Sequence, residues 1–190
     1  KLEQQRNRRY KSYLLEMLKN KFEKQPKKWD KTAITPGTNF MSKLASYTNF
    51  YYKNKEKQYG INKFIVSTSN DPGEGEHKIF SFIRDNKTVH SKQVSMVYGL
   101  DADLIMLALN HLPISKQIYL YRETPEFIKS LNSELEPGEA YFLDIPKLAQ
   151  MIRLDMTGAS VVSKKQESNR LYDYILLCFF LGNDFMPHFP

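Results

Sequence analysis

Two short motifs each hold a closely spaced pair of acids. Glu74 and Glu76 lie in PGEGEHK, and Asp101 and Asp103 lie in GLDAD. A single acid near a helix start commonly caps backbone N–H groups and favours the helix dipole. Four carboxylates that lie close together repel one another, however, and protons or bound cations relieve that repulsion. Hard oxygen ligands of this kind suit Mg²⁺ or Mn²⁺, so both pairs are candidate metal ligands.

A fifth acid, Asp184, follows a strongly apolar stretch that we predict to be a helix over residues 168–181. The carboxyl end of a helix carries partial negative charge, so a carboxylate there is disfavoured unless a cation lies nearby. Two divalent ions roughly 3.5–4 Å apart stabilise the attacking and leaving oxygens of an in-line phosphoryl displacement. The five carboxylates therefore predict metal-dependent phosphoryl chemistry.

Positive charge is concentrated at the start of the chain. The formal net charge is +7, and residues 1–30 hold ten Lys or Arg against four acids, whereas the remaining residues are nearly balanced. At helical spacing, Lys1, Gln5, Arg8 and Arg9 fall within an arc of about 100°, while apolar side chains that we expect to pack lie on the opposite side. The basic face is either a solvated surface or a binding surface for phosphate groups.

The elements that must position these residues alternate between strands and helices. We predict helices over residues 2–25, 38–55, 74–85, 102–109, 146–154 and 168–181, strands over 63–69, 94–99, 117–121 and 141–145, and a loop over 122–138. This alternation is typical of an α/β fold with a mostly parallel central sheet that is covered by helices on both faces. Ligands of open α/β sheets bind beyond the carboxyl ends of the strands. We therefore expect the acid pairs after strands 63–69 and 94–99 to converge.

Composition excludes several classes of protein. The chain has 190 residues, of which 41% are hydrophobic, and this content excludes a disordered tail or a linker. It contains no apolar run long enough for a membrane-spanning helix. The single cysteine, Cys178, allows neither an internal disulfide nor a cysteine-based zinc site. Because the sequence lacks an initial Met and opens within a helical pattern, we expect an internal piece of a longer protein.

Five segments together resemble a known family. In order and spacing, the chain resembles the catalytic region of the XRN-type 5′→3′ exoribonucleases, which degrade mRNA in the cytoplasm and nucleus of eukaryotes. The resemblance implies that residues 1–190 are part of one N-terminal catalytic domain, truncated at both ends, with a PIN-like or flap-nuclease-like core. It also implies an intracellular location, cytoplasmic or nuclear, without a membrane. The segments are QQRNRR (4–9), ITPGTNFM (34–41), DPGEGEHKIFSFIR (71–84), VYGLDADLIMLAL (97–109) and CFFLGNDFMPHFP (178–190).

The resemblance also implies site residues and a substrate. The family holds Mg²⁺ with seven acids and hydrolyses RNA processively from a 5′-monophosphate end. Five of the acids match this chain, and the other two belong to motifs upstream of it, so we expect the 190-residue chain alone to be inactive. The implied metal ligands are Glu74, Glu76, Asp101, Asp103 and Asp184, and the implied 5′-phosphate ligands are Lys1, Gln5, Arg8 and Arg9.

Two alternative functions share part of this pattern. A structure-specific flap DNA nuclease uses the same arrangement of metal-binding carboxylates. A catalytically inactive RNA-binding module would retain the basic helix without cutting. The preference of the protein for RNA or DNA, and its ability to cleave, separate these alternatives from the exoribonuclease.

Overall fold

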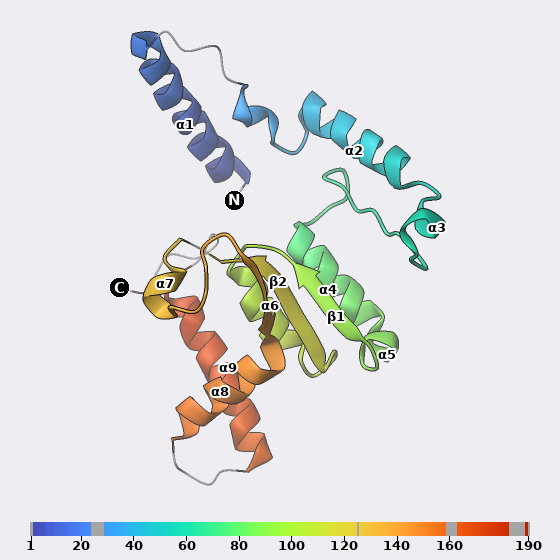
Figure 1. Ribbon diagram of the computed structural model, residues 1–190, viewed down its shortest axis with the longest axis vertical. Coiled ribbons are helices and arrows are strands. Elements are labelled where there is room, and N and C mark those ends of the chain that lie inside the picture. Colours follow the sequence, from blue (N-terminus) through green and yellow to red (C-terminus); the bar gives the residue numbers. More distant parts are fainter. Residues whose placement is uncertain (1, 24–28, 125, 159–162, 183–188, 190) are drawn as a thin grey trace. The chain divides into compact units, whose positions relative to one another are not determined.

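The structure is a computed structural model that describes residues 2–23, 29–124, 126–158, 163–182 and 189 (Figure 1). It comprises two compact units, Lys1–Gly75 and Glu76–Pro190. Among the described residues, the regular elements of the first unit are helices, and the second unit contains a three-stranded sheet. No helix in the described part of the chain is long and apolar enough to cross a membrane.

The first unit contains helix α1 (Leu2–Glu23), the 3₁₀ turn η1 (Lys31–Ala33), helix α2 (Asn39–Tyr52) and the short helix α3 (Glu56–Tyr59). Thr38 caps α2, because its hydroxyl oxygen accepts a hydrogen bond from the Met41 N–H at 3.3 Å. The same hydroxyl donates to the Ala33 carbonyl oxygen at 2.6 Å and so joins α2 to η1. The helices predicted over residues 2–25 and 38–55 are confirmed.

The strand predicted over residues 63–69 is wrong, because this segment joins no sheet among the described residues. A β-branched run becomes a strand only when a neighbouring strand supplies backbone partners. Here local hydrogen bonds take their place. The Asp71 carboxylate accepts from the Thr68 N–H at 2.7 Å and from the Ser67 hydroxyl at 3.2 Å, which closes a turn before the next helix.

The second unit confirms the α/β class. Strands β1 and β2 are parallel, and α6 connects them, whereas β3 pairs with β2 in the antiparallel direction. The sheet is therefore mixed, because a loop rather than a helical crossover joins β2 to β3. Its elements are α4 (Gly75–Asp85), α5 (Lys87–His90), β1 (Val94–Tyr98), α6 (Asp103–His111), β2 (Gln117–Glu123), α7 (Ile128–Leu131), β3 (Ala140–Asp144), α8 (Ile145–Thr157) and α9 (Lys164–Phe180).

The core lies on one face of this sheet. Val97, Ile118 and Leu120 point from β1 and β2 into a cluster that α4, α6, α8 and α9 complete. On the opposite face Met96 is 68% exposed and Tyr98 60% exposed. Among the described residues of this unit, the expectation that helices cover both faces is therefore wrong, because α4, α6, α8 and α9 share a single core on one face.

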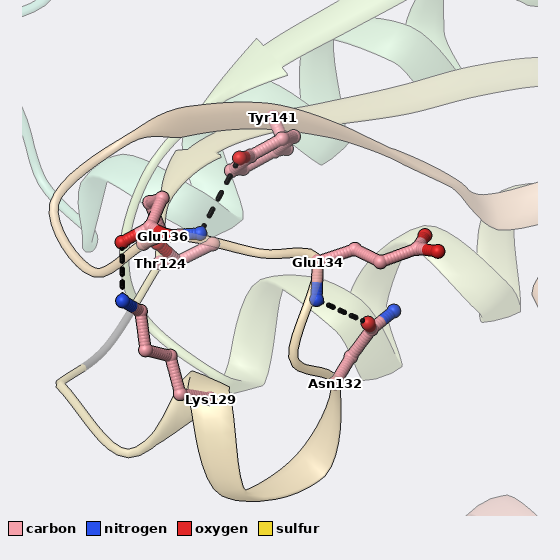
Figure 2. A network of polar contacts seen from close by, with 6 residues as sticks. All are labelled: Thr124, Lys129, Asn132, Glu134, Glu136 and Tyr141. Atoms are coloured by element: carbon pink, nitrogen blue, oxygen red, sulfur yellow. Dashed lines mark hydrogen bonds and ion pairs between the residues drawn. The ribbon is translucent and has the colours of Figure 1, made fainter.

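The loop between β2 and β3 is held by its own polar contacts (Figure 2). The Thr124 hydroxyl donates to the carbonyl oxygen of Glu136, and the N–H of Glu136 donates to the Tyr141 hydroxyl at 3.4 Å. The Lys129 ammonium lies 2.6 Å from the Glu136 carboxylate, but both side chains are more than half exposed, so this ion pair contributes little. The predicted loop is confirmed, with the short helix α7 inside it.

His111 is a buried polar residue at the end of α6. The Arg84 guanidinium donates to its Nε2 at 2.8 Å, and its Nδ1–H donates to the Leu107 carbonyl oxygen at 2.6 Å. Burial lowers the pKa of the His111 imidazole, and the Arg84 charge lowers it further. The ring is therefore neutral at pH 7 and ties α4 to α6.

Candidate metal centre

The loop between β1 and α6 positions two of the predicted acids. Its backbone is fixed to β2, because the Gly99 N–H donates to the Tyr121 carbonyl oxygen at 3.2 Å and the Arg122 guanidinium donates to the Leu100 carbonyl oxygen at 2.8 Å. The Asp101 carboxylate accepts from the Asp103 N–H at 3.2 Å, so it also supports the start of α6. Sequence reasoning did not find Arg122 as a residue that holds this loop, because it lies on the next strand.

Glu76, in the first turn of α4, joins Asp101 and Asp103 in one cluster, which we call the acidic trio. Each side chain offers a carboxylate oxygen, and these three oxygens lie within 4.8 Å of one another. Mg²⁺ holds its oxygen ligands at about 2.1 Å, which places neighbouring ligands roughly 3–4 Å apart. Small rotations of the side chains would therefore bring all three oxygens around one ion, and the trio suits a hard divalent cation.

A cavity of about 180 Å³ lies beside the trio and is lined by Glu76 and Asp103. Apolar side chains, among them Met106 and Phe179, form much of its wall. Electrostatic interactions are stronger beside apolar walls than in open water, so this setting favours tight interaction between carboxylates and a cation. Sequence reasoning did not identify the contribution of α9, because spacing along one helix does not show which cavity the helix borders.

The trio contains three of the five predicted metal ligands. Glu74 is half-buried, lies in the first unit directly before α4, and is not a member of the cluster. Asp184 lies outside the described residues. Gly182, two positions before it, lines the cavity beside the trio.

Gly99→Ala is expected to lower the free energy of unfolding by about 1–3 kcal/mol, the usual cost of overpacking a core. A Cβ at this position would lie 2.2 Å from Cδ1 of Leu104, which is 3% exposed and has little room to move. Urea denaturation measures the change. Gly75→Ala is the matched control, since nothing lies within 4 Å of a Cβ there. Equal stability of Gly99→Ala and wild-type protein would contradict the close packing of the loop on α6.

Helix α1 carries a second candidate site, which we call the α1 cavity. It has a volume of about 380 Å³ and is lined by Arg8, Arg9, Ser12 and Lys31. Arg9 donates to the Ile34 carbonyl oxygen and, at 3.3 Å, to the Thr35 hydroxyl. Arg9 therefore also fixes the η1 turn to α1, while Arg8 is exposed. Three cationic side chains around one cavity suit an anionic ligand.

The predicted phosphate ligands are only partly described. Lys1 lies outside the described residues, and Gln5 lies in α1 while its side chain is outside the described part of the structure. Lys31 was missed, because only the fold brings η1 back to α1. The apolar side of α1 is more open than expected, with Met17 48% exposed and Leu18 56% exposed.

Comparison with known proteins decides the family. A family model described as the N-terminus of XRN 5′→3′ exonucleases matches residues 1–124, which is more than half of the chain. The chain belongs to the XRN 5′→3′ exonuclease family. A second model of this family, described as the Xrn1 helical domain, matches residues 164–190 and so includes α9. The resemblance seen in the five sequence segments is confirmed.

Curated XRN-family proteins match nearly the whole chain. A "5′-3′ exoribonuclease 2" of Yarrowia lipolytica is 38% identical over 93% of the chain, and one of Arabidopsis thaliana is 32% identical over 100% of it. A "5′-3′ exoribonuclease 1" of Schizosaccharomyces pombe is 33% identical over 100% of the chain. The chain spans only 18%, 24% and 15% of the length of these three proteins, respectively.

Proposed function

We propose that this chain is part of the catalytic region of a metal-dependent 5′→3′ exoribonuclease. The observation that carries the proposal is the acidic trio, whose carboxylate oxygens lie within 4.8 Å of one another. The printed names of the relatives give RNA as their substrate and 5′→3′ as their direction. The bound ion is Mg²⁺ or Mn²⁺, because three carboxylates with no thiolate or imidazole suit a hard cation.

In this proposal Glu76, Asp101 and Asp103 bind the metal, together with Glu74 and Asp184. Asp184 is retained because Gly182, two residues earlier, lines the cavity beside the trio. Two divalent ions would supply stabilisation of the attacking and leaving oxygens of the phosphodiester. The carboxylates would hold these ions, while the loop contacts of Gly99 and Arg122 keep Asp101 and Asp103 in place.

The α1 cavity receives the 5′-monophosphate of the RNA. Arg8, Arg9 and Lys31 offer cationic donors, and Ser12 adds a hydroxyl. Lys1 and Gln5, on the same predicted face of the helix, complete the proposed ligand set. A guanidinium matches the geometry of phosphate oxygens, so this group of side chains favours a terminal phosphate. Repeated capture of each new 5′ end makes degradation processive, and the role is RNA decay in the cytoplasm or the nucleus.

Residues 1–190 form part of one catalytic domain in this proposal, and the 190-residue chain alone does not degrade RNA. Two of the family's seven acids have no counterpart in the chain. An ion that lacks two of its ligands is held loosely, and catalysis tolerates little misplacement of the reacting groups. In the following test, the 190-residue chain alone is therefore expected to leave the RNA intact.

The test is the degradation of a 5′-monophosphorylated RNA by the full-length protein. With a label in the 5′-terminal phosphate, a labelled mononucleotide is expected to be released from the start of the reaction in Mg²⁺, and the labelled RNA is expected to persist in a metal chelator. Shortening from the 3′ end would contradict the proposal. Preferential cutting of DNA at single-strand to duplex junctions would favour the flap nuclease, and tight binding without cutting would favour the inactive module.

A further inference from the structure

A second cavity of the sheet-containing unit lies away from the acidic trio. It has a volume of about 370 Å³ and is lined on its polar side by Lys116, Arg153, Ser168 and Tyr172. We call it the α8–α9 cavity, since residues of both helices line it; α8 and α9 also pack against each other (Figure 1). Its size falls within the usual range of small-molecule sites, about 300–1,000 Å³.

The cavity has an unbalanced positive charge. Among the described residues that line it, Lys116 and Arg153 are cationic and none is acidic. The Nε of Arg153 is buried and has no hydrogen-bond partner in the described structure. Because this Nε is inaccessible to water, a ligand in the cavity would be held by the terminal guanidinium nitrogens of Arg153 and by the Lys116 ammonium.

The α8–α9 cavity is separate from the candidate metal centre. Along α9, Ser168 lines this cavity, whereas Cys178 lines the cavity beside the trio. These two residues are ten positions apart, which corresponds to about 15 Å of helix. A ligand in the α8–α9 cavity therefore does not contact the metal-binding carboxylates.

We propose that the α8–α9 cavity binds the phosphate group of a small phosphate monoester. A guanidinium, an ammonium and a hydroxyl form the donor set that recognises phosphate oxygens. The site holds two cations at one place rather than a row of them along a groove, so it suits a single phosphate group and not a polynucleotide backbone. The apolar part of the wall, including Leu109 and Leu171, leaves room for an uncharged portion of the ligand.

The test is calorimetric titration of the full-length protein with inorganic phosphate and with a nucleoside 5′-monophosphate, in a chelator so that no metal recruits the anion. Wild-type protein is expected to bind both ligands. Lys116→Ala and Arg153→Lys are each expected to weaken binding by on the order of tenfold or more, since each removes a charged hydrogen bond. Lys147→Ala and Arg170→Ala are matched controls on α8 and α9 outside the cavity and are expected to bind like wild type.

Two further arms keep the outcome clear. The Arg8→Ala variant lacks one cation of the α1 cavity. In a titration of this variant, the phosphate binding that depends on Lys116 and Arg153 is expected to persist. Lys116 is exposed, so Lys116→Ala is expected to melt at the wild-type temperature. This variant therefore still tests the proposal if Arg153→Lys folds poorly. The proposal fails if wild-type protein binds neither ligand, or if folded Lys116→Ala binds both as tightly as wild type. The proposal also fails if the protein binds 5′-hydroxyl RNA but neither of the two phosphate ligands. The titration does not depend on RNA cleavage, so failure of the proposed exoribonuclease function would be seen separately.

Discussion

Asp103→Asn in the full-length protein is expected to lower the rate of RNA cleavage by about a thousandfold or more. A metal ion contributes several kcal/mol of transition-state stabilisation, and each 1.36 kcal/mol is a factor of ten in rate. The amide keeps the size of the side chain while it removes the anionic ligand beside Glu76 and Asp101. The measurement is single-turnover decay of a 5′-monophosphorylated RNA in Mg²⁺, with RNA binding measured in parallel and expected to be retained.

Stability separates a metal-binding role of Asp103 from a structural one. In a chelator, loss of one of three neighbouring negative charges is expected to leave the free energy of unfolding unchanged or to raise it, because repulsion falls. Asp155→Asn is the matched control, since Asp155 is an exposed acid on α8 and is not a member of the trio. Near-normal cleavage by folded Asp103→Asn, or a cleavage defect of equal size in Asp155→Asn, would exclude the proposed role.

The full-length protein is expected to degrade RNA with a 5′-monophosphate roughly a hundredfold faster than RNA with a 5′-hydroxyl. Charged hydrogen bonds contribute on the order of 1.5–3 kcal/mol each, and the hydroxyl end loses two or more of them. A capped end is also expected to resist, because it lacks the free 5′-monophosphate that the cationic side chains of the α1 cavity would bind. Arg8→Ala is expected to lower the ratio of the two decay rates, 5′-monophosphate over 5′-hydroxyl RNA, by about tenfold, since it removes one charged hydrogen bond.

The choice of variant matters for this measurement. Arg8 is exposed, so its substitution removes charge without disturbing the fold, whereas Arg9→Ala also breaks the contacts to Ile34 and Thr35. Lys19→Ala is the matched control, because Lys19 is an exposed cation of α1 that does not line the cavity. Decay is compared at one salt concentration, since phosphate contacts depend on salt. If wild-type protein degraded both RNAs at the same rate, this face of α1 would be a solvated surface and not a phosphate-binding site.

The sequence predicted the elements whose signals are local. The GLDAD motif follows a short β-branched strand and opens an apolar helix, and the structure has β1, the loop and α6 at these positions. The same local logic predicted that Asp101 and Asp103 lie at a strand end. The predicted convergence of the two acid pairs is met only in part: Glu76 approaches Asp101 and Asp103 from the first turn of α4, whereas Glu74 is not a member of the cluster.

The sequence could not predict features that depend on distant partners. The run at residues 63–69 has the composition of a strand but lacks a strand partner among the described residues, so composition alone gave the wrong element. The antiparallel direction of β3 depends on the path of the loop through Thr124 and Tyr141. Lys31 reaches the α1 cavity only through tertiary packing, and no spacing rule connects it to Arg8.

In the proposed function, the acidic trio binds the divalent metal on which RNA hydrolysis depends. The most direct test is titration of the full-length protein with Mn²⁺, followed by electron paramagnetic resonance. Glu76→Gln, Asp101→Asn and Asp103→Asn are each predicted to weaken Mn²⁺ binding by about tenfold or more, at least as much as the loss of an outer-shell partner. Asp155→Asn is predicted to bind Mn²⁺ like wild type. Unchanged Mn²⁺ affinity in all three trio variants, each shown to be folded, would contradict the account.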